Sequence, residues 1–362
     1  MRLHHFESLR PLCPTCRNTD GSGAPLRIAQ VAHEQENQIL QGILHCSNPQ
    51  CQREYPVIDG IPLLLGDLRR FVADNAPRLL TRTDLHPDLE SLIGDCLGPG
   101  SDFDGSRQQV SSYCWEHYGD FDTGLETDSA RRGTLLAALK LGLEIADALP
   151  DGPVLDLGCG PGRSTFELAR RTGRAVLGVD LHLPMLRFAS RLLTTGTASY
   201  SLRRVGLVYE RREFPVDLPG AERVDFWACD AAALPFEAGT FAAATALNLL
   251  DCVYSPQTML ASLASVLRPG APAVLTTPYD WSPGATPIEA WIGGHSQRGP
   301  LAGSSDATLR ALLGEPEGES ALPLRLVAER EGVPWRVRLH DRAFMEYRLH
   351  LLVARRQDDP DG

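Results

Sequence analysis

Short apolar runs alternate with amphipathic segments over the second half of the chain. Seven runs have the composition of strands, at 154–157, 175–179, 224–230, 241–249, 273–277, 324–331 and 344–355. Segments with apolar residues at helical spacing accompany them, at 130–149, around 166–169, and at 184–193, 254–267 and 304–313. This order predicts an α/β fold with a seven-stranded, largely parallel sheet that ends in an antiparallel pair.

The rest of the chain divides into shorter parts. Residues 1–66 contain two cysteine pairs and candidate strands at 25–28 and 38–44, which predict a small separate module. Residues 67–107 are acidic and carry a glycine-containing break at 97–101, so we expect a linker with short helices at 69–71 and 89–93. The main domain is expected over 108–357, with a β-hairpin inserted at 199–214.

A glycine-rich turn follows the first strand of the main domain. Gly158, Gly160 and Gly162 leave the backbone without side chains, and the following helix aims free N–H groups at the turn. Asp180 ends the second strand, where a carboxylate can accept both hydroxyls of a ribose. A dinucleotide turn would need G-x-G-x-x-G, but Arg163 breaks that spacing. The alternative is a purely structural turn that joins the strand to the helix and binds no ligand.

The pattern Asp156-x-Gly158-x-Gly160-x-Gly162 resembles the first motif of class I S-adenosylmethionine-dependent methyltransferases, whose sheet is Rossmann-like. In that family a carboxylate and a backbone N–H after the third strand hold the adenine amino group, a position that Asp230 and Ala231 occupy here. The resemblance therefore implies S-adenosyl-L-methionine as cofactor and a set of cofactor-binding residues at the carboxyl ends of the strands: Asp156, Gly158, Cys159, Gly160, Gly162, Asp180, Leu181, Asp230, Ala231 and Asn248.

Composition narrows the classes of partner. A formal net charge of −11 argues against a protein that coats nucleic acid by bulk electrostatics, although a local basic patch remains compatible with it. The hairpin carries Arg203, Arg204, Arg211 and Arg212, which either grip phosphate or form an ordinary solvated strand face. No apolar run approaches the ~20 residues that cross a bilayer, and the first residues lack the apolar core of a signal peptide. We therefore expect a cytoplasmic protein without a membrane partner.

The N-terminal cysteines have the spacing of a metal site. Cys13, Cys16, Cys46 and Cys51 form two thiol pairs that match tetrahedral structural zinc, and His45 could replace one thiol. The alternative is four free cysteines in a strand-rich module. With the segment 55–65, these pairs resemble the small zinc ribbons that activate tRNA and protein methyltransferases, and the zinc-binding head of an rRNA guanine methyltransferase. The five scattered cysteines are expected to be reduced, mostly buried thiols: Cys96, Cys114, Cys159, Cys229 and Cys252.

Aromatic residues gather before and after the predicted sheet core. Residues 108–356 resemble the methyltransferase domain of ovothiol biosynthesis, which methylates a ring nitrogen of 5-mercaptohistidine. The likeness includes Tyr113, 117–120, the glycine turn with Arg163 and Ser164, 248–251, Tyr254, and the loop 278–294. It implies Asp251, His117 and Tyr279 as catalytic candidates. It also implies an acceptor-binding group: Tyr113, Tyr118, Trp281, Glu289 and Trp291. The sequence departs from this family at Leu181-His182, after Gly294, and in its zinc ribbon, so the acceptor transfers only as a class.

Several of these residues also have a purely structural interpretation. Tyr113, Tyr118 and His117 could form a pocket wall, or could simply pack on the core. Three functions remain open at this stage. The favoured one is N-methylation of a small histidine-like or related amino acid. The second is RNA methylation with the zinc ribbon as the grip, and the third is a scaffold that binds the cofactor without activity. The acidic total favours a small-molecule partner over nucleic acid.

Overall fold

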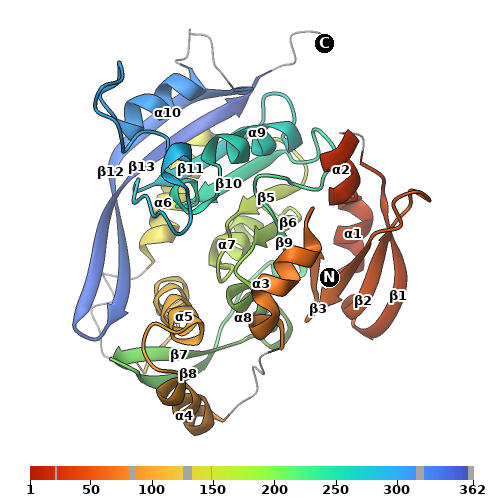
Figure 1. Cartoon of the computed structure of the whole chain (residues 1–362), viewed down its shortest axis with the longest axis vertical. Coiled ribbons are helices and arrows are strands. Elements are labelled where there is room, and N and C mark those ends of the chain that lie inside the picture. The colour runs from red at the N-terminus through yellow and green to blue at the C-terminus, as the bar shows by residue number, and fades with distance from the viewer. Residues whose placement is uncertain (21–22, 81–85, 125–132, 148, 315–321, 358–362) are drawn as a thin grey trace.

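Eleven strands form one mixed sheet in the computed structural model, which describes residues 1–20, 23–80, 86–124, 133–147, 149–314 and 322–357 (Figure 1). The strand order is β1-β2-β3-β4-β9-β6-β5-β10-β11-β13-β12. The centre is parallel and almost wholly buried, as its apolar runs predict. Its strands are β5 (Val154–Leu157), β6 (Val176–Asp180), β9 (Val224–Cys229), β10 (Ala243–Leu247) and β11 (Pro272–Thr277).

One end of the sheet is the predicted antiparallel pair. β13 (Ala343–Arg356) runs antiparallel to β11 and pairs with β12 (Leu324–His340). Both strands are longer than predicted and extend as a curved hairpin toward α5 (Asp102–Tyr118) and β7 (Thr197–Val205) (Figure 1). The seven predicted strands are therefore adjacent, but the prediction of a seven-stranded sheet is wrong, because four further strands join the opposite end.

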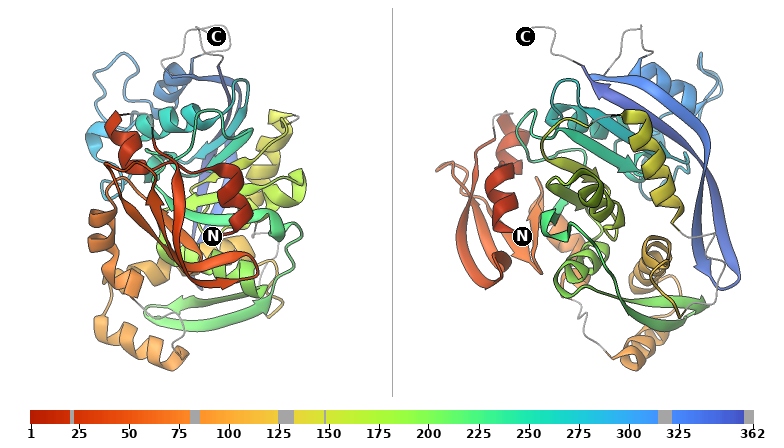
Figure 2. Two further views of the ribbon diagram at one scale, coloured as in Figure 1. Left: turned by 90° about the vertical axis from the view of Figure 1, so that its right-hand side faces the viewer. Right: turned by 180° about the vertical axis from the view of Figure 1, so that it is seen from behind.

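Those four strands come from the N-terminal module, residues 1–66. It contains α1 (Leu3–Leu9), α2 (Pro14–Asp20), β1 (Leu26–Gln35), β2 (Gln38–Cys46), β3 (Glu54–Ile58) and β4 (Ile61–Leu64). β4 pairs in parallel with β9, with Leu63 opposite Ala228 and Leu64 opposite Cys229. The Arg2 backbone N–H also donates to Asp225 Oδ2 at 2.6 Å. The module thus extends the sheet, at the end farthest from β12 (Figure 2).

Helices cover both faces of the sheet. α6 (Thr134–Ala146), α7 (Arg163–Thr172) and α8 (Leu183–Thr195) bury apolar side chains on one face, together with α5. α9 (Pro256–Val266) and α10 (Ser305–Leu313) bury theirs on the other face. Among the residues that the structure describes, no helix combines the length and apolar character needed to cross a membrane.

The segment predicted as a linker is more helical than expected. It contains α3 (Leu68–Leu80) and α4 (Pro87–Leu97) instead of two very short helices. The glycine-containing break at 97–101 separates α4 from α5 (Asp102–Tyr118), whose N-terminus is capped by the Ser101 hydroxyl accepting from the Asp104 N–H. α5 was not predicted because polar residues such as Asp104, Arg107 and Ser111 are buried along it, which hides the helical apolar period.

The predicted hairpin is confirmed. β7 (Thr197–Val205) and β8 (Val208–Pro215) form a separate antiparallel sheet after α8. Tyr200 of β7 packs against Phe188 of α8, with ring centroids 6.2 Å apart, and β7 also contacts α5. The hairpin therefore lies beside the helices of one face and is not part of the main sheet (Figure 1).

Candidate functional site

The glycine turn after β5 is a tight bend without side chains. Gly158, Gly160 and Gly162 have φ values of +73°, +53° and +89°. A Cβ on Gly162 would lie 2.6 Å from Cζ of Phe226, and a Cβ on Gly158 would lie 2.7 Å from Cδ1 of Leu249. Both the left-handed backbone and the close neighbours therefore require glycine, and Gly158 and Gly160 are partly exposed whereas Gly162 is buried.

Gly162→Ala is expected to lower the free energy of unfolding by about 2 kcal/mol or more, since it combines left-handed strain with overlap on Phe226. Chemical denaturation monitored by circular dichroism measures this. Gly173→Ala is the matched control, because Gly173 also has a positive φ (+66°) but open space around its Cα. An equal loss in both variants would show that packing at Gly162 contributes nothing.

Asp156 lies under this bend, and both of its carboxylate oxygens are occupied. Oδ2 accepts from the hydroxyls of Ser164 (2.6 Å) and Thr165 (2.7 Å), and Oδ1 accepts from Thr245 (2.7 Å). Burial raises the pKa of this carboxyl, and the three hydroxyls oppose that shift. Asp156 thereby ties β5 to the first turn of α7 and to β10, which indicates that it positions the bend from below.

Asp180 connects the bend to the next strand. Its Oδ2 accepts from the Gly160 N–H and its Oδ1 from the His182 N–H, both at 2.8 Å. Leu181, beside it, is 41% exposed. Asp230 follows β9 and accepts from the Ala232 N–H at 2.9 Å, next to the buried Ala231. Since β9 and β6 are adjacent, the two partly exposed carboxylates lie at neighbouring strand ends.

Two more predicted cofactor residues flank the bend. The Cys159 N–H donates to the Val179 carbonyl at 3.1 Å, and the Cys159 side chain is buried. Asn248 follows β10 in a left-handed conformation (φ +53°). Its Oδ1 accepts from the Thr276 hydroxyl at 2.7 Å, whereas its buried Nδ2 has no hydrogen-bond partner in the structure. Asn248 thus retains a free donor at the carboxyl edge of the sheet.

Asp251, the first catalytic candidate, holds the loop after β11. Its Oδ1 accepts from the Thr277 hydroxyl (3.1 Å) and its Oδ2 from the Asp280 N–H (2.9 Å). The side chain is only 2% exposed, and burial raises its pKa. These contacts assign Asp251 a positioning role toward the loop that follows β11.

His117 lies on α5 and is 5% exposed. Burial, assisted by the nearby Arg163, lowers its pKa to about 3, so the ring is neutral near pH 7 and is a weak base. Its Nδ1 has no hydrogen-bond partner among the residues that the structure describes. Tyr113, one turn earlier, is partly exposed, and its ring centroid lies 6.3 Å from that of His117.

Tyr118 is fully buried and supports the glycine turn. Its hydroxyl donates to the Pro161 carbonyl at 2.8 Å, and its ring packs against Phe188 at 5.3 Å. Arg163, at the start of α7, donates to Asp120 (3.0 Å) and to the His117 carbonyl (3.2 Å), which ties α5 to the same turn. The observed contacts of Tyr118 therefore agree with a side chain that packs on the core.

The loop after β11 is organised by its own aromatic residues. The Tyr279 hydroxyl is hydrogen-bonded to His350 Nδ1 at 2.7 Å, and His350 Nε2 is 2.9 Å from Glu329 Oε2. Trp281 stacks on Trp291, with centroids 5.9 Å apart, and donates to the Ser305 hydroxyl at 3.0 Å. Trp291 donates to the Thr286 carbonyl, whereas Glu289 is exposed. These contacts build the loop.

Two residues that sequence analysis missed lie beside Tyr113. Trp335 of β12 is 6.3 Å from the Tyr113 ring and stacks on Tyr347 of β13, with centroids 4.9 Å apart. The Tyr347 hydroxyl donates to Asp280 Oδ2 at 2.8 Å. The predicted sixth strand ended at 331, so Trp335 lay outside it. A longer predicted hairpin would have placed Trp335 opposite Tyr347, and this pairing would have indicated that the two rings are in contact.

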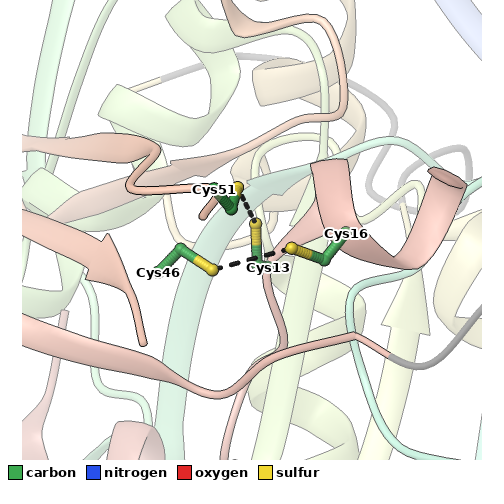
Figure 3. A group of neighbouring side chains, drawn as sticks. All are labelled: Cys13, Cys16, Cys46 and Cys51. Atoms are coloured by element: carbon green, nitrogen blue, oxygen red, sulfur yellow. Dashed lines mark hydrogen bonds between the residues drawn. The ribbon is translucent and has the colours of Figure 1, made fainter. Parts of the chain in front are cut away.

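The four N-terminal cysteines converge in space (Figure 3). Their sulfur atoms all lie within 4.8 Å of one another, with Cys13–Cys51 at 3.8 Å and Cys16–Cys46 at 3.7 Å. Tetrahedral Zn–S bonds of about 2.3 Å place sulfurs about 3.8 Å apart. His45 is outside this group.

The surroundings of these sulfurs also fit a metal site. The Asn48 N–H points to the Cys46 sulfur at 3.4 Å, and the Tyr55 hydroxyl lies 3.2 Å from the Cys13 sulfur. Such second-layer contacts orient thiolates that bind a metal. Of the scattered cysteines, Cys114, Cys159 and Cys229 are buried as expected, but Cys96 and Cys252 are exposed.

A cavity of about 570 Å³ lies elsewhere, between the N-terminal module, α3, α5, α8 and the β7–β8 hairpin. Phe103, Val110, Phe188 and Tyr200 contribute to its apolar lining. None of the predicted cofactor residues lines it.

Comparison with known proteins identifies a methyltransferase domain in the middle of the chain. Residues 155–275 match the family model described as a methyltransferase domain. The chain is 30% identical over 122 residues to the O-methyltransferase cnsE of Penicillium expansum, a match that covers 34% of this chain and 36% of that protein. The chain thus spans about a third of the length of this curated relative.

Two solved structures are also similar. A SAM-dependent methyltransferase of Methanosarcina mazei is 21% identical with a TM-score of 0.39, over 58% of this chain and 94% of that one. Phosphoethanolamine N-methyltransferase 2 of Haemonchus contortus, in complex with S-adenosyl-L-methionine, is 20% identical with a TM-score of 0.32, over 48% and 35%. At this level of similarity neither structure informs the choice of acceptor.

Proposed function

We propose that this chain, which contains a class I S-adenosylmethionine-dependent methyltransferase domain, transfers a methyl group from S-adenosyl-L-methionine to a nitrogen of a small histidine-like or related amino acid. The observation that carries the proposal is the link between the glycine bend and Asp180, with Asp230 at the adjoining strand end. Gly158 and Gly160 of the bend are partly exposed, and the two carboxylates match the two polar ends of an adenosine.

When bound, the cofactor supplies an electrophilic methyl group on a positively charged sulfur. The residues around it then have to position the acceptor, because methyl transfer is an in-line displacement and positioning alone lowers its barrier by about 7–11 kcal/mol. Asp180 would hold the ribose and Asp230 the adenine amino group. Asp251 fixes the loop that follows β11. The partly exposed ring of Tyr113 offers an aromatic face to a cation and limits the access of water.

The direct test uses purified protein and cofactor labelled in the methyl group. Label is expected to appear on histidine derivatives and not on total RNA. Transfer to RNA alone would replace the proposed acceptor with the second candidate. Cofactor binding without transfer to either class of acceptor would favour a scaffold.

The arginines of the β7–β8 hairpin bear on the RNA alternative, because each is engaged within the protein. Arg212 donates to Asp122 Oδ1 at 2.7 Å, Arg204 pairs with Asp341 at 3.0 Å, and Arg211 pairs with Glu90. Arg203 donates to Gln108 Oε1 at 2.8 Å. These pairs favour a role of the hairpin in structure over a phosphate grip.

Arg212→Gln is accordingly expected to lower the free energy of unfolding by about 3 kcal/mol, because it leaves the carboxylate of Asp122 buried without its cation. The affinity for RNA should not change. Arg204→Gln is the matched control, since its pairs are more exposed and its loss should cost less than about 1 kcal/mol. Weaker RNA binding by Arg204→Gln, measured by filter retention, would instead support the phosphate grip.

We further propose that Cys13, Cys16, Cys46 and Cys51 hold a structural Zn²⁺. Four thiolates at this separation match its preferred donor set, and a closed four-sulfur shell leaves no position for a substrate. The ion would fasten α2 to the end of β2.

A further inference from the structure

The side chains that could recognise the methyl acceptor come from three separate parts of the chain. Tyr113 lies on α5, Trp335 and Tyr347 lie on the β12–β13 hairpin, and Asp280 follows β11. Tyr113, Trp335 and Tyr347 form a continuous row of rings with centroid spacings of 6.3 and 4.9 Å. The last ring of this row is hydrogen-bonded to Asp280.

Asp280 is the exposed carboxylate at the end of this row of rings. Its backbone N–H is held by Asp251 at 2.9 Å and its Oδ2 accepts from Tyr347 at 2.8 Å, so the side chain has a fixed direction. Asp280 is nevertheless exposed, and both of these contacts leave its Oδ1 available. Asp251, by contrast, is buried with both oxygens occupied.

The charged side chains that act on the row of rings include the carboxylates of Asp180, Asp251 and Asp280. Burial raises the pKa of Tyr113, and Asp251 and Asp180 add to the shift. Burial also raises the pKa of Tyr347, and the hydrogen bond to Asp280 is the next largest cause of this shift. Arg336, which follows Trp335 on the hairpin, pairs with Glu346 at 3.3 Å, and these two residues alternate with Trp335 and Tyr347 and so face the other way. The partly exposed rings of Tyr113 and Tyr347 are joined by the buried ring of Trp335, and two such rings beside a carboxylate attract an organic cation.

We propose that Asp280, oriented by Tyr347, binds a protonated amino group of the methyl acceptor against the partly exposed rings of Tyr113 and Tyr347. The acceptor class is thereby a primary or secondary amine whose charged group is held apart from the atom that receives the methyl group. This inference rests on the function proposed above and deepens it, because it identifies the feature by which an acceptor is recognised.

The test measures binding by calorimetry in the presence of S-adenosylhomocysteine. Phenethylamine and 2-phenylethanol are the probes, because they differ only in the charged group. We expect the amine to bind about tenfold or more tighter than the alcohol. Asp280→Asn should remove this preference and leave the alcohol unchanged. Tyr347→Phe should reduce the preference by a smaller factor, and Glu346→Gln, on the opposite face of the hairpin, is the matched control and should keep it.

Equal binding of the two probes to the unaltered protein, undetectable binding of both, or an unchanged preference in both Asp280→Asn and Tyr347→Phe would overturn the inference. Thermal melting of each variant checks that it is folded, and Tyr347→Phe serves if Asp280→Asn is not. Failure of the proposed function has a different signature, since S-adenosylhomocysteine itself would then not bind.

Discussion

Asp180→Ala is expected to weaken the binding of S-adenosyl-L-methionine about 100-fold or more. The proposed role of Asp180 is to accept two hydrogen bonds from the ribose, and hydrogen bonds to a charged group contribute about 1.5–3 kcal/mol each. The substitution also removes the acceptor of the Gly160 N–H, so the glycine bend itself loses a support. Isothermal titration calorimetry measures the affinity directly.

Asp217→Ala is the control for this experiment, because Asp217 is an exposed carboxylate away from the strand ends. Its cofactor affinity should equal that of the unaltered protein. Asp180→Asn removes the charge but keeps the shape of the side chain. Its cofactor affinity should lie between those of Asp180→Ala and the unaltered protein. An Asp180→Ala protein that melts normally and still binds the cofactor with full affinity would disprove the assignment of the site.

Loss of the metal is expected to have the largest effect on stability. Structural zinc sites bind with about 10–16 kcal/mol, which is comparable to the whole free energy of folding of an ordinary domain. Changing Cys13 and Cys16 to Ser should therefore unfold at least the N-terminal module and abolish bound zinc. Elemental analysis measures the metal, and loss of circular dichroism on heating measures the stability.

Cys96→Ser serves as the comparison, because Cys96 is exposed and lies outside the four-sulfur group. It should keep both the metal and the melting temperature. Treatment of the unaltered protein with a chelator should reproduce the double substitution. Protein that is purified without zinc, and whose melting temperature does not respond to Cys13→Ser and Cys16→Ser, would rule out a metal site.

The centre of the fold was predictable because its signals are local. Each parallel strand is a short apolar run, and the glycine turn, Asp180 and Asp230 follow their strands directly in the sequence. The four cysteines were likewise predictable from spacing. In each case the residues that identify the feature are only a few positions apart, or form a recognised pattern of pairs.

What sequence analysis missed depends on contacts between distant segments. The pairing of β4 with β9 joins Leu63 to Ala228, and no local pattern announces it. Trp335 and Tyr113 meet only because the β12–β13 hairpin bends toward α5. Carboxylates posed a different difficulty. Asp156 and Asp280 are equally polar in the sequence, and only the structure shows that the first is occupied by hydroxyls and the second is exposed.

The uninterrupted ladder of strands has a consequence for how the protein responds to its surroundings. β4 pairs with Cys229 directly before Asp230, so the strand that carries an adenine-binding candidate shares its edge with the metal-binding module. We therefore expect the whole sheet to melt in a single cooperative transition in a calorimetric scan. An oxidant that ejected zinc would then also diminish the proposed methylation, which would make this activity sensitive to redox stress at a distance from the candidate cofactor site.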